Sequence, residues 1–98
     1  MADYRIEVGR RAARDLRKLD PRERARIERA IRSEAARLGS SQGGRGGKRV
    51  KSLRGQRDEF TRLRVGTFRV IYEPKRSERL MLILDVVHRR DLERRLGR

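Results

Sequence analysis

The 98-residue sequence contains no cysteine, no tryptophan and a single histidine. Without cysteine, disulfide bonds and thiolate metal sites are excluded, and one histidine does not suffice for a histidine-based metal centre. We therefore expect neither a metal nor another cofactor. Aromatic residues are also scarce, with two phenylalanines and two tyrosines. A hydrophobic core must accordingly be built mainly from aliphatic side chains.

Long apolar segments are missing as well. The chain starts with the residues MADYR, which do not resemble the apolar stretch of a secretory signal. The longest apolar run, from Leu80 to Val87, is interrupted by Asp85 and is too short to cross a bilayer. These features predict a cytoplasmic protein that does not enter a membrane.

Positive charge is abundant. Lysine and arginine number 29 against 14 acidic residues, which gives a net charge of +15. Such a charge attracts polyanions, among them nucleic acid, the ribosome, an acidic protein and an anionic membrane surface. The alternative interpretation is an arginine-rich but merely solvated surface. The length predicts a single domain over residues 1–98.

The first half of the chain predicts one strand and two helices. Apolar and charged residues alternate from Tyr4 to Val8, as in a half-buried strand, and helical spacing follows from Arg10 to Leu19. Asp20 and Pro21 have the character of a helix start, and Gly39 that of a helix end. An apolar stripe between them comprises Ile27, Ile31, Ala35 and Leu38.

The second half predicts a β region. Residues 40–47 are rich in glycine and serine and indicate a loop. Alternation predicts strands over 61–65 and 68–72, joined by a tight turn at Gly66 and Thr67. A hairpin loop over 74–78 and a strand over 80–87 follow, and that strand is apolar on both faces, which is typical of a central position. Residues 88–96 can form a terminal helix.

The predicted fold class is therefore α+β, with the order β-α-α-β-β-β-α. We expect a mostly antiparallel four-stranded sheet with the helical pair on one face. The other face would remain partly open to a ligand.

Alternation also predicts where arginine side chains gather. If Thr61, Leu63 and Val65 face the helices, Arg62 and Arg64 share the opposite face. Arg69 on the next strand and Arg89 after the last strand can join them, and guanidinium groups bind phosphate oxygens bidentately. Further RNA-binding candidates are Lys48, Lys51 and Arg54 at the rim and Phe60, whose ring can stack on a base. The competing interpretations are arginine stems that cover apolar surface, and hydrophobic packing of Phe60.

Several segments resemble the RelE/ParE superfamily of toxins, and its RelE branch in particular. They are YRIEV (4–8), RAARDLRKL (11–19), KSLRG (51–55), RLRVGTFRVIY (62–72) and VHRRD (87–91). The resemblance extends over nearly the whole chain, and the segment from Arg62 to Tyr72 is its most specific part.

The resemblance implies a RelE-like, microbial-ribonuclease-like fold and a ribosome-dependent endoribonuclease that cleaves mRNA in the A site. Arg62, Arg64, Arg69 and Arg89 match the positions that hold the scissile phosphate. The resemblance also implies a cognate antitoxin, which we expect to be acidic and partly disordered, and a toxin–antitoxin heterotetramer. Many superfamily members carry a tyrosine shortly after the segment matching VHRRD, whereas Glu93 stands near that place here.

Metal-free RNA cleavage also needs groups that move protons, which arginine does poorly because it stays protonated. Candidates for proton transfer are Lys51, His88 and Glu93, with Lys48, Glu59 and Asp91 as further possibilities. Ribosomal RNA could supply a missing group.

Two alternative functions are also consistent with the sequence. One is inhibition of DNA gyrase, as in the ParE branch, although the short helical pair favours the RelE side. The other is a non-catalytic RNA- or ribosome-binding module. A membrane-surface protein is less consistent with the sequence, because the apolar stripes face a core.

Overall fold

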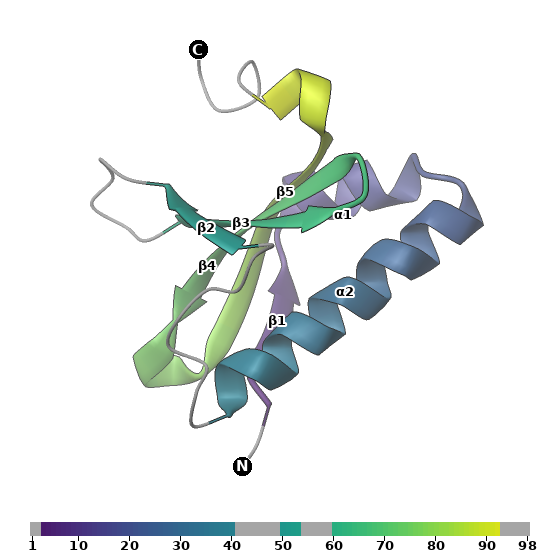
Figure 1. Cartoon of the computed structure of the whole chain (residues 1–98). Coiled ribbons are helices and arrows are strands. Elements are labelled where there is room, and N and C mark those ends of the chain that lie inside the picture. Colours follow the sequence, from purple (N-terminus) through teal and green to yellow (C-terminus); the bar gives the residue numbers. More distant parts are fainter. Residues whose placement is uncertain (1–2, 41–49, 54–59, 93–98) are drawn as a thin grey trace.

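The computed structural model describes residues 3–40, 50–53 and 60–92, with the backbone alone for residues 50–53 (Figure 1). In these residues one strand is followed by two helices and then by four strands, with a 3-10 turn after each of the last two strands. The elements are β1 (Arg5–Val8), α1 (Arg10–Arg17), α2 (Pro21–Gly39), β2 (Val50–Leu53), β3 (Phe60–Val65), β4 (Phe68–Lys75), η1 (Arg76–Glu78), β5 (Leu80–His88) and η2 (Arg89–Asp91).

The strands form one mixed sheet in the order β1-β5-β4-β3-β2. β1 runs parallel to β5, and the other neighbours are antiparallel. The predicted α+β class and the mostly antiparallel sheet are confirmed, and β5 lies between two strands as its double-sided apolar pattern indicated. The structure adds a fifth strand, β2, which the sequence did not reveal because its apolar residues, Val50 and Leu53, are three positions apart and do not alternate.

Both helices lie on one face of the sheet, and α2 runs diagonally across it (Figure 1). The predicted stripe is buried in the main core together with the helix-facing residues of the sheet. The predicted start of α2 is confirmed, since Oδ1 of Asp20 accepts a hydrogen bond from the backbone N–H of Glu23 at 2.9 Å. At the other end, Gly39 is the last helical residue and Ser40 is the C-cap.

Where β1 ends, Gly9 and then α1 take over the hydrogen bonding to the edge of β5. β1 pairs with β5 only as far as Ile83, and the N–H of Gly9 then donates to the Ile83 carbonyl at 2.8 Å. Beyond that point, Oδ2 of the buried Asp15 on α1 accepts the N–H of Val86 at 3.1 Å. A side chain thus satisfies a buried backbone donor that lies beyond the β1–β5 pairing of the described residues.

The opposite face of the sheet carries a smaller apolar cluster. Ile71, Val87 and Leu92 are buried there, with Phe60 and Leu84 packed against them. Leu92 follows η2, so the end of the described chain helps to cover this face. The predicted helix over 88–96 begins as η2, and its residues after Leu92 lie outside the described part.

The β4–β5 hairpin differs from the prediction. A loop was expected over 74–78, but β4 continues through Pro74, which pairs with Met81, to Lys75. β3 pairs with β4 only up to Tyr72, so Pro74 has a neighbouring strand on one side. Its missing N–H therefore removes no ladder hydrogen bond on the free side, which is where proline is tolerated in sheets. The predicted loop over 40–47 lies outside the described residues except for Ser40. Neither described helix is both long enough and apolar enough to span a membrane.

Candidate anion-binding site

As predicted, alternate side chains of β3 lie on opposite faces of the sheet. Thr61, Leu63 and Val65 are buried, and the latter two belong to the main core beneath the helices. Arg62 and Arg64 therefore lie on the other face, where Arg62 is half-buried and Arg64 is exposed. Arg62 is paired with Ile71 of the smaller apolar cluster, as expected of a stem that covers apolar surface.

Arg69 is the cross-strand partner of Arg64 and folds back over the β3–β4 turn. Its Nη1 donates to the carbonyl oxygens of Gly66 at 3.1 Å and Phe68 at 2.9 Å. Burial lowers the pKa of the Arg69 guanidinium, and so do the positive charges of Arg64, Arg62 and Arg89, in that order. Arg69 is therefore close enough to the other three predicted arginines to be repelled by them.

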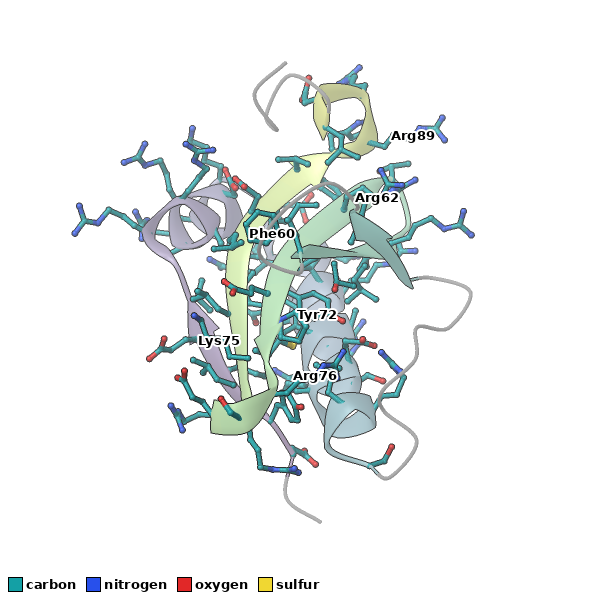
Figure 2. The ribbon with its side chains drawn as sticks, turned by 90° about the vertical axis from the view of Figure 1, so that its left-hand side faces the viewer. Phe60, Arg62, Tyr72, Lys75, Arg76 and Arg89 are labelled. Atoms are coloured by element: carbon teal, nitrogen blue, oxygen red, sulfur yellow. The ribbon has the colours of Figure 1, made fainter. Side chains whose placement is uncertain are left out.

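Arg89 reaches this group because the end of β5 is tied to the same turn. Its backbone N–H donates to the carbonyl of Thr67 at 2.7 Å. Figure 2 shows Arg62 and Arg89 near one end of the sheet, whereas Tyr72, Lys75 and Arg76 lie toward the other end. Residues that are 20 or more positions apart in the sequence are thus brought to one hairpin tip.

A cavity of about 530 Å³ opens at this tip. It lies between the N-terminal half of α2 and the β3–β4 turn, and no carboxylate is found among the described residues that line it. Five arginines contribute to its wall. The lining residues are Arg26, Arg29, Ala30, Arg64, Val65, Gly66, Arg69 and Arg89.

Arg26 and Arg29 were not predicted as site residues. Both lie on α2, whose charged positions were interpreted as solvated because they fall outside the apolar stripe. Their spacing of three residues places them on one helix face, together with the small Ala30. That spacing was visible in the sequence, but nothing in it indicated that this face looks onto the β3–β4 turn.

Gly66 permits the close approach of α2 to the turn. Its φ of +62° lies in the left-handed region. A Cβ added there would lie 2.9 Å from Nη2 of Arg26 and 3.0 Å from its Cζ. The Arg26 guanidinium therefore occupies the space that a side chain at position 66 would need.

His88 lies on the helix-facing side of β5, away from Arg69. Its ring contacts Phe68 edge to face at 5.6 Å between centroids. Its Nδ1 accepts the backbone N–H of Arg90 at 3.3 Å. Although His88 adjoins Arg89 in sequence, it does not line the cavity.

The other predicted site residues are not among the described residues that line the cavity. Phe60 packs in the smaller apolar cluster, which favours the structural interpretation of its ring. The backbone of Lys51 in β2 is paired with Arg62 of β3, and its side chain is not described. Lys48, Arg54, Glu59 and Glu93 lie outside the described residues. In the described part of the chain, no cluster of acidic or histidine side chains could hold a metal ion.

The arrangement provides convergent, permanently charged hydrogen-bond donors in a small space. Guanidinium groups suit phosphate oxygens, and fixed positive charge stabilises negative charge that develops during a reaction. Every ionisable residue among the described lining residues is an arginine, and arginine side chains stay protonated and do not accept protons. The geometry thus supports phosphate binding more directly than acid–base chemistry.

A family model, the ParE toxin of the type II toxin–antitoxin system parDE, matches residues 6–93. The chain belongs to the ParE toxin family. It is accordingly a toxin of a toxin–antitoxin system of the RelE/ParE type, and the match includes every arginine of the cavity. The superfamily indicated by the sequence segments is confirmed. No curated protein sequence matches the chain.

Solved structures of RelE toxins share this fold. The RelBE2 toxin–antitoxin complex from Mycobacterium tuberculosis contains a chain that is 27% identical, with a TM-score of 0.71 over 90% of this toxin and 100% of that chain. The archaeal RelE–RelB complex from Pyrococcus horikoshii gives 25% identity and a TM-score of 0.68 over 90% and 97%. The Escherichia coli RelBE complex gives 20% identity and 0.60 over 87% and 95%, which shows the shared fold.

Proposed function

We propose that this toxin is a ribosome-dependent mRNA endoribonuclease that cleaves in the A site. The observation that carries the proposal is the convergence of Arg64, Arg69 and Arg89 on one cavity without a described carboxylate. The three side chains come from β3, β4 and η2, so their guanidinium groups approach the cavity from different elements. The structural similarity to RelE toxins supports the same reaction class.

In the proposed reaction, the 2′-OH of the substrate loses its proton and attacks the adjacent phosphorus. The bond to the 5′-oxygen then breaks, and that oxygen receives a proton. The arginines stabilise the phosphorane and its additional negative charge through oriented donors. This assigns phosphate and transition-state stabilisation to Arg64, Arg69 and Arg89, with Arg62 adding positive charge beside Arg69.

Proton transfer requires groups beyond the arginines. Because His88 does not line the cavity, we propose Lys51 and Glu93 as the candidates within the chain, and ribosomal RNA can supply a further group. Lys51 is a candidate because β2 places its backbone beside that of Arg62. Ammonium groups surrounded by positive charge lose their proton more readily.

We further propose that an acidic, partly disordered antitoxin binds the toxin, with a heterotetramer as the assembly. The structural relatives include toxin–antitoxin complexes from a bacterium and an archaeon, and the net charge of +15 favours an acidic partner.

The test is to induce the toxin under tight control and map mRNA 5′ ends during growth arrest. We expect cleavage within translated regions, in phase with codons. The Arg64→Ala and Arg89→Ala variants should lose at least about a hundredfold of this cleavage, because each removes a donor to the transition state. The Arg14→Ala variant on α1 removes an exposed arginine outside the cavity and should cleave normally.

A second candidate function is inhibition of DNA gyrase, which the ParE family match favours. Growth arrest with intact mRNA and trapped gyrase–DNA complexes would support it and contradict the nuclease proposal. Ribosome binding with neither effect would instead indicate a non-catalytic module.

A further inference from the structure

The cavity has two walls of different origin. Arg64, Arg69 and Arg89 form one wall on the sheet side, and the charges of Arg64 and Arg89 both lower the pKa of Arg69. The other wall is the face of α2 that carries Arg26 and Arg29. Arg26 and Arg29 thus come from a different element than the three sheet-side arginines, although all five open into the same cavity.

Arg26 and Arg29 of α2 are exposed and can bind a ligand. Within the described part of the chain, neither Arg26 nor Arg29 forms an ion pair with a carboxylate. Ala30 leaves room beside them, and Gly66 lets the Arg26 guanidinium lie against the turn. Two exposed guanidinium groups one helical turn apart repel each other, so an anion between them would relieve that repulsion.

We propose that Arg26 and Arg29 form a second phosphate subsite, which binds the phosphate next to the one held by Arg64, Arg69 and Arg89. The ligand is then a single-stranded nucleic acid that contributes two consecutive phosphates to one cavity. This inference rests on the proposed function, because the first phosphate is the scissile one. It adds α2 to the substrate-binding surface and makes the toxin select for a chain over a single phosphate group.

Nucleic acid fits the cavity better than an acidic peptide. Five guanidinium groups in about 530 Å³ call for compact, concentrated negative charge. A phosphodiester presents its charged oxygens at every backbone unit, and guanidinium groups bind them bidentately. A peptide carries carboxylates on flexible side chains and pays additional ordering entropy for each one.

The subsite can be tested with short 2′-O-methyl oligonucleotides, which the 2′-OH chemistry cannot cleave. One oligonucleotide carries a single charged phosphate among neutral methylphosphonate linkages, and its counterpart carries two adjacent charged phosphates. Binding to the purified toxin is measured by fluorescence anisotropy. In the wild type, the second charge should tighten binding by at least about tenfold.

The Arg26→Gln/Arg29→Gln double variant should lose the gain from the second phosphate and keep its affinity for the single phosphate. The matched control is Arg14→Gln/Arg17→Gln, which removes two exposed arginines with the same spacing from α1. This control should keep the gain. Arg26→Lys/Arg29→Lys should give an intermediate gain, because lysine keeps the charge but not the bidentate geometry. Thermal melting monitored by circular dichroism confirms that each variant is folded.

The proposal is overturned if Arg26→Gln/Arg29→Gln keeps the full gain, or if it weakens binding of both oligonucleotides equally. It is also overturned if an oligoglutamate peptide binds the wild type more tightly than the doubly charged oligonucleotide and depends on Arg26 and Arg29. Failure of the nuclease proposal has a different signature, namely a normal gain from the second phosphate in a toxin that leaves cellular mRNA intact.

Discussion

At the scale of single residues, Tyr72 links α2 to the sheet through a buried polar network. Its ring is fully buried, and its hydroxyl donates to Oε2 of Glu34 at 2.5 Å. The same oxygen accepts from Nη2 of Arg37 at 2.6 Å. Burial raises the pKa of Tyr72 well above its usual value, and the hydrogen bond to Glu34 raises it further. The network thus fixes the C-terminal half of α2 on β4.

Replacing this hydroxyl should destabilise the fold. In Tyr72→Phe, the buried Glu34 carboxylate loses one of its donors, and we expect the free energy of unfolding to fall by about 1–3 kcal/mol at neutral pH. Urea titration measures the change. Tyr4→Phe is the control, since it keeps the buried ring over which Arg79 lies at 5.3 Å and should cost less. Equal losses in both variants would contradict a specific role for the Tyr72 hydroxyl.

The same residue predicts a dependence on alkaline pH. The raised pKa means that folded Tyr72 keeps its proton where the unfolded chain loses it, above pH ~10. The stabilisation is therefore complete below that pH and is lost as the pH rises, by about 1.4 kcal/mol per pH unit. Urea titrations of the wild type at increasing pH should show this decline. Tyr72→Phe should lack this component, and an identical decline in the variant would contradict the assignment.

At the scale of elements, the β3–β4 turn organises the cavity. Gly66 provides the left-handed turn residue, its carbonyl accepts from Arg69, and its missing side chain makes room for Arg26. The backbone carbonyl of Thr67 accepts a hydrogen bond from the backbone N–H of Arg89. A two-residue turn therefore sets the positions of three arginines from α2, β4 and η2.

Gly66→Ala should disturb both stability and binding. A non-glycine residue at this φ costs roughly 1–2 kcal/mol, and the new Cβ must displace the Arg26 guanidinium. Gly66→Asn is the matched comparison, because asparagine tolerates this backbone conformation better. We expect urea titration to show a smaller loss of stability for Gly66→Asn, while both variants weaken binding of the doubly charged oligonucleotide. Full binding by both would mean that Arg26 need not lie over the turn.

At the scale of the whole molecule, the net charge of +15 opposes the compact state. The folded chain brings like charges closer together than the unfolded chain does, so self-repulsion lowers its stability. The clustering of five arginines at one end concentrates this effect. Binding of a polyanion would relieve the same repulsion.

Salt should therefore stabilise the free toxin. Between about 10 mM and about 150 mM NaCl the Debye length falls from about 30 Å to about 8 Å, so the repulsion is increasingly screened. We expect the free energy of unfolding in urea to rise by on the order of 1 kcal/mol over this range. The rise should be smaller in Arg14→Gln/Arg17→Gln, whose net charge is lower by two. A stability that falls with salt would show that favourable ion pairs dominate instead.

Much of the fold follows from local patterns. The alternation from Thr61 to Val65 predicted which side chains face the helices, and Asp20 with Glu23 predicted the start of α2. Those features depend on neighbours in sequence, which is why they could be read from it. Pro74 was interpreted wrongly as part of a loop, since its tolerance depends on where β3 ends, a tertiary fact.

The sequence by itself determined both helices, four of the five described strands and the superfamily, and it indicated that Arg62 and Arg64 share one sheet face, because strand period and residue chemistry are local properties. Only the tertiary structure decided that Arg64, Arg69 and Arg89 share their cavity with Arg26 and Arg29. The angle at which α2 crosses the sheet brings Arg26 and Arg29 to the β3–β4 turn. That angle results from the packing of the whole core. Charge composition indicated a polyanionic partner, and the packed fold brought five of the arginines together around one cavity.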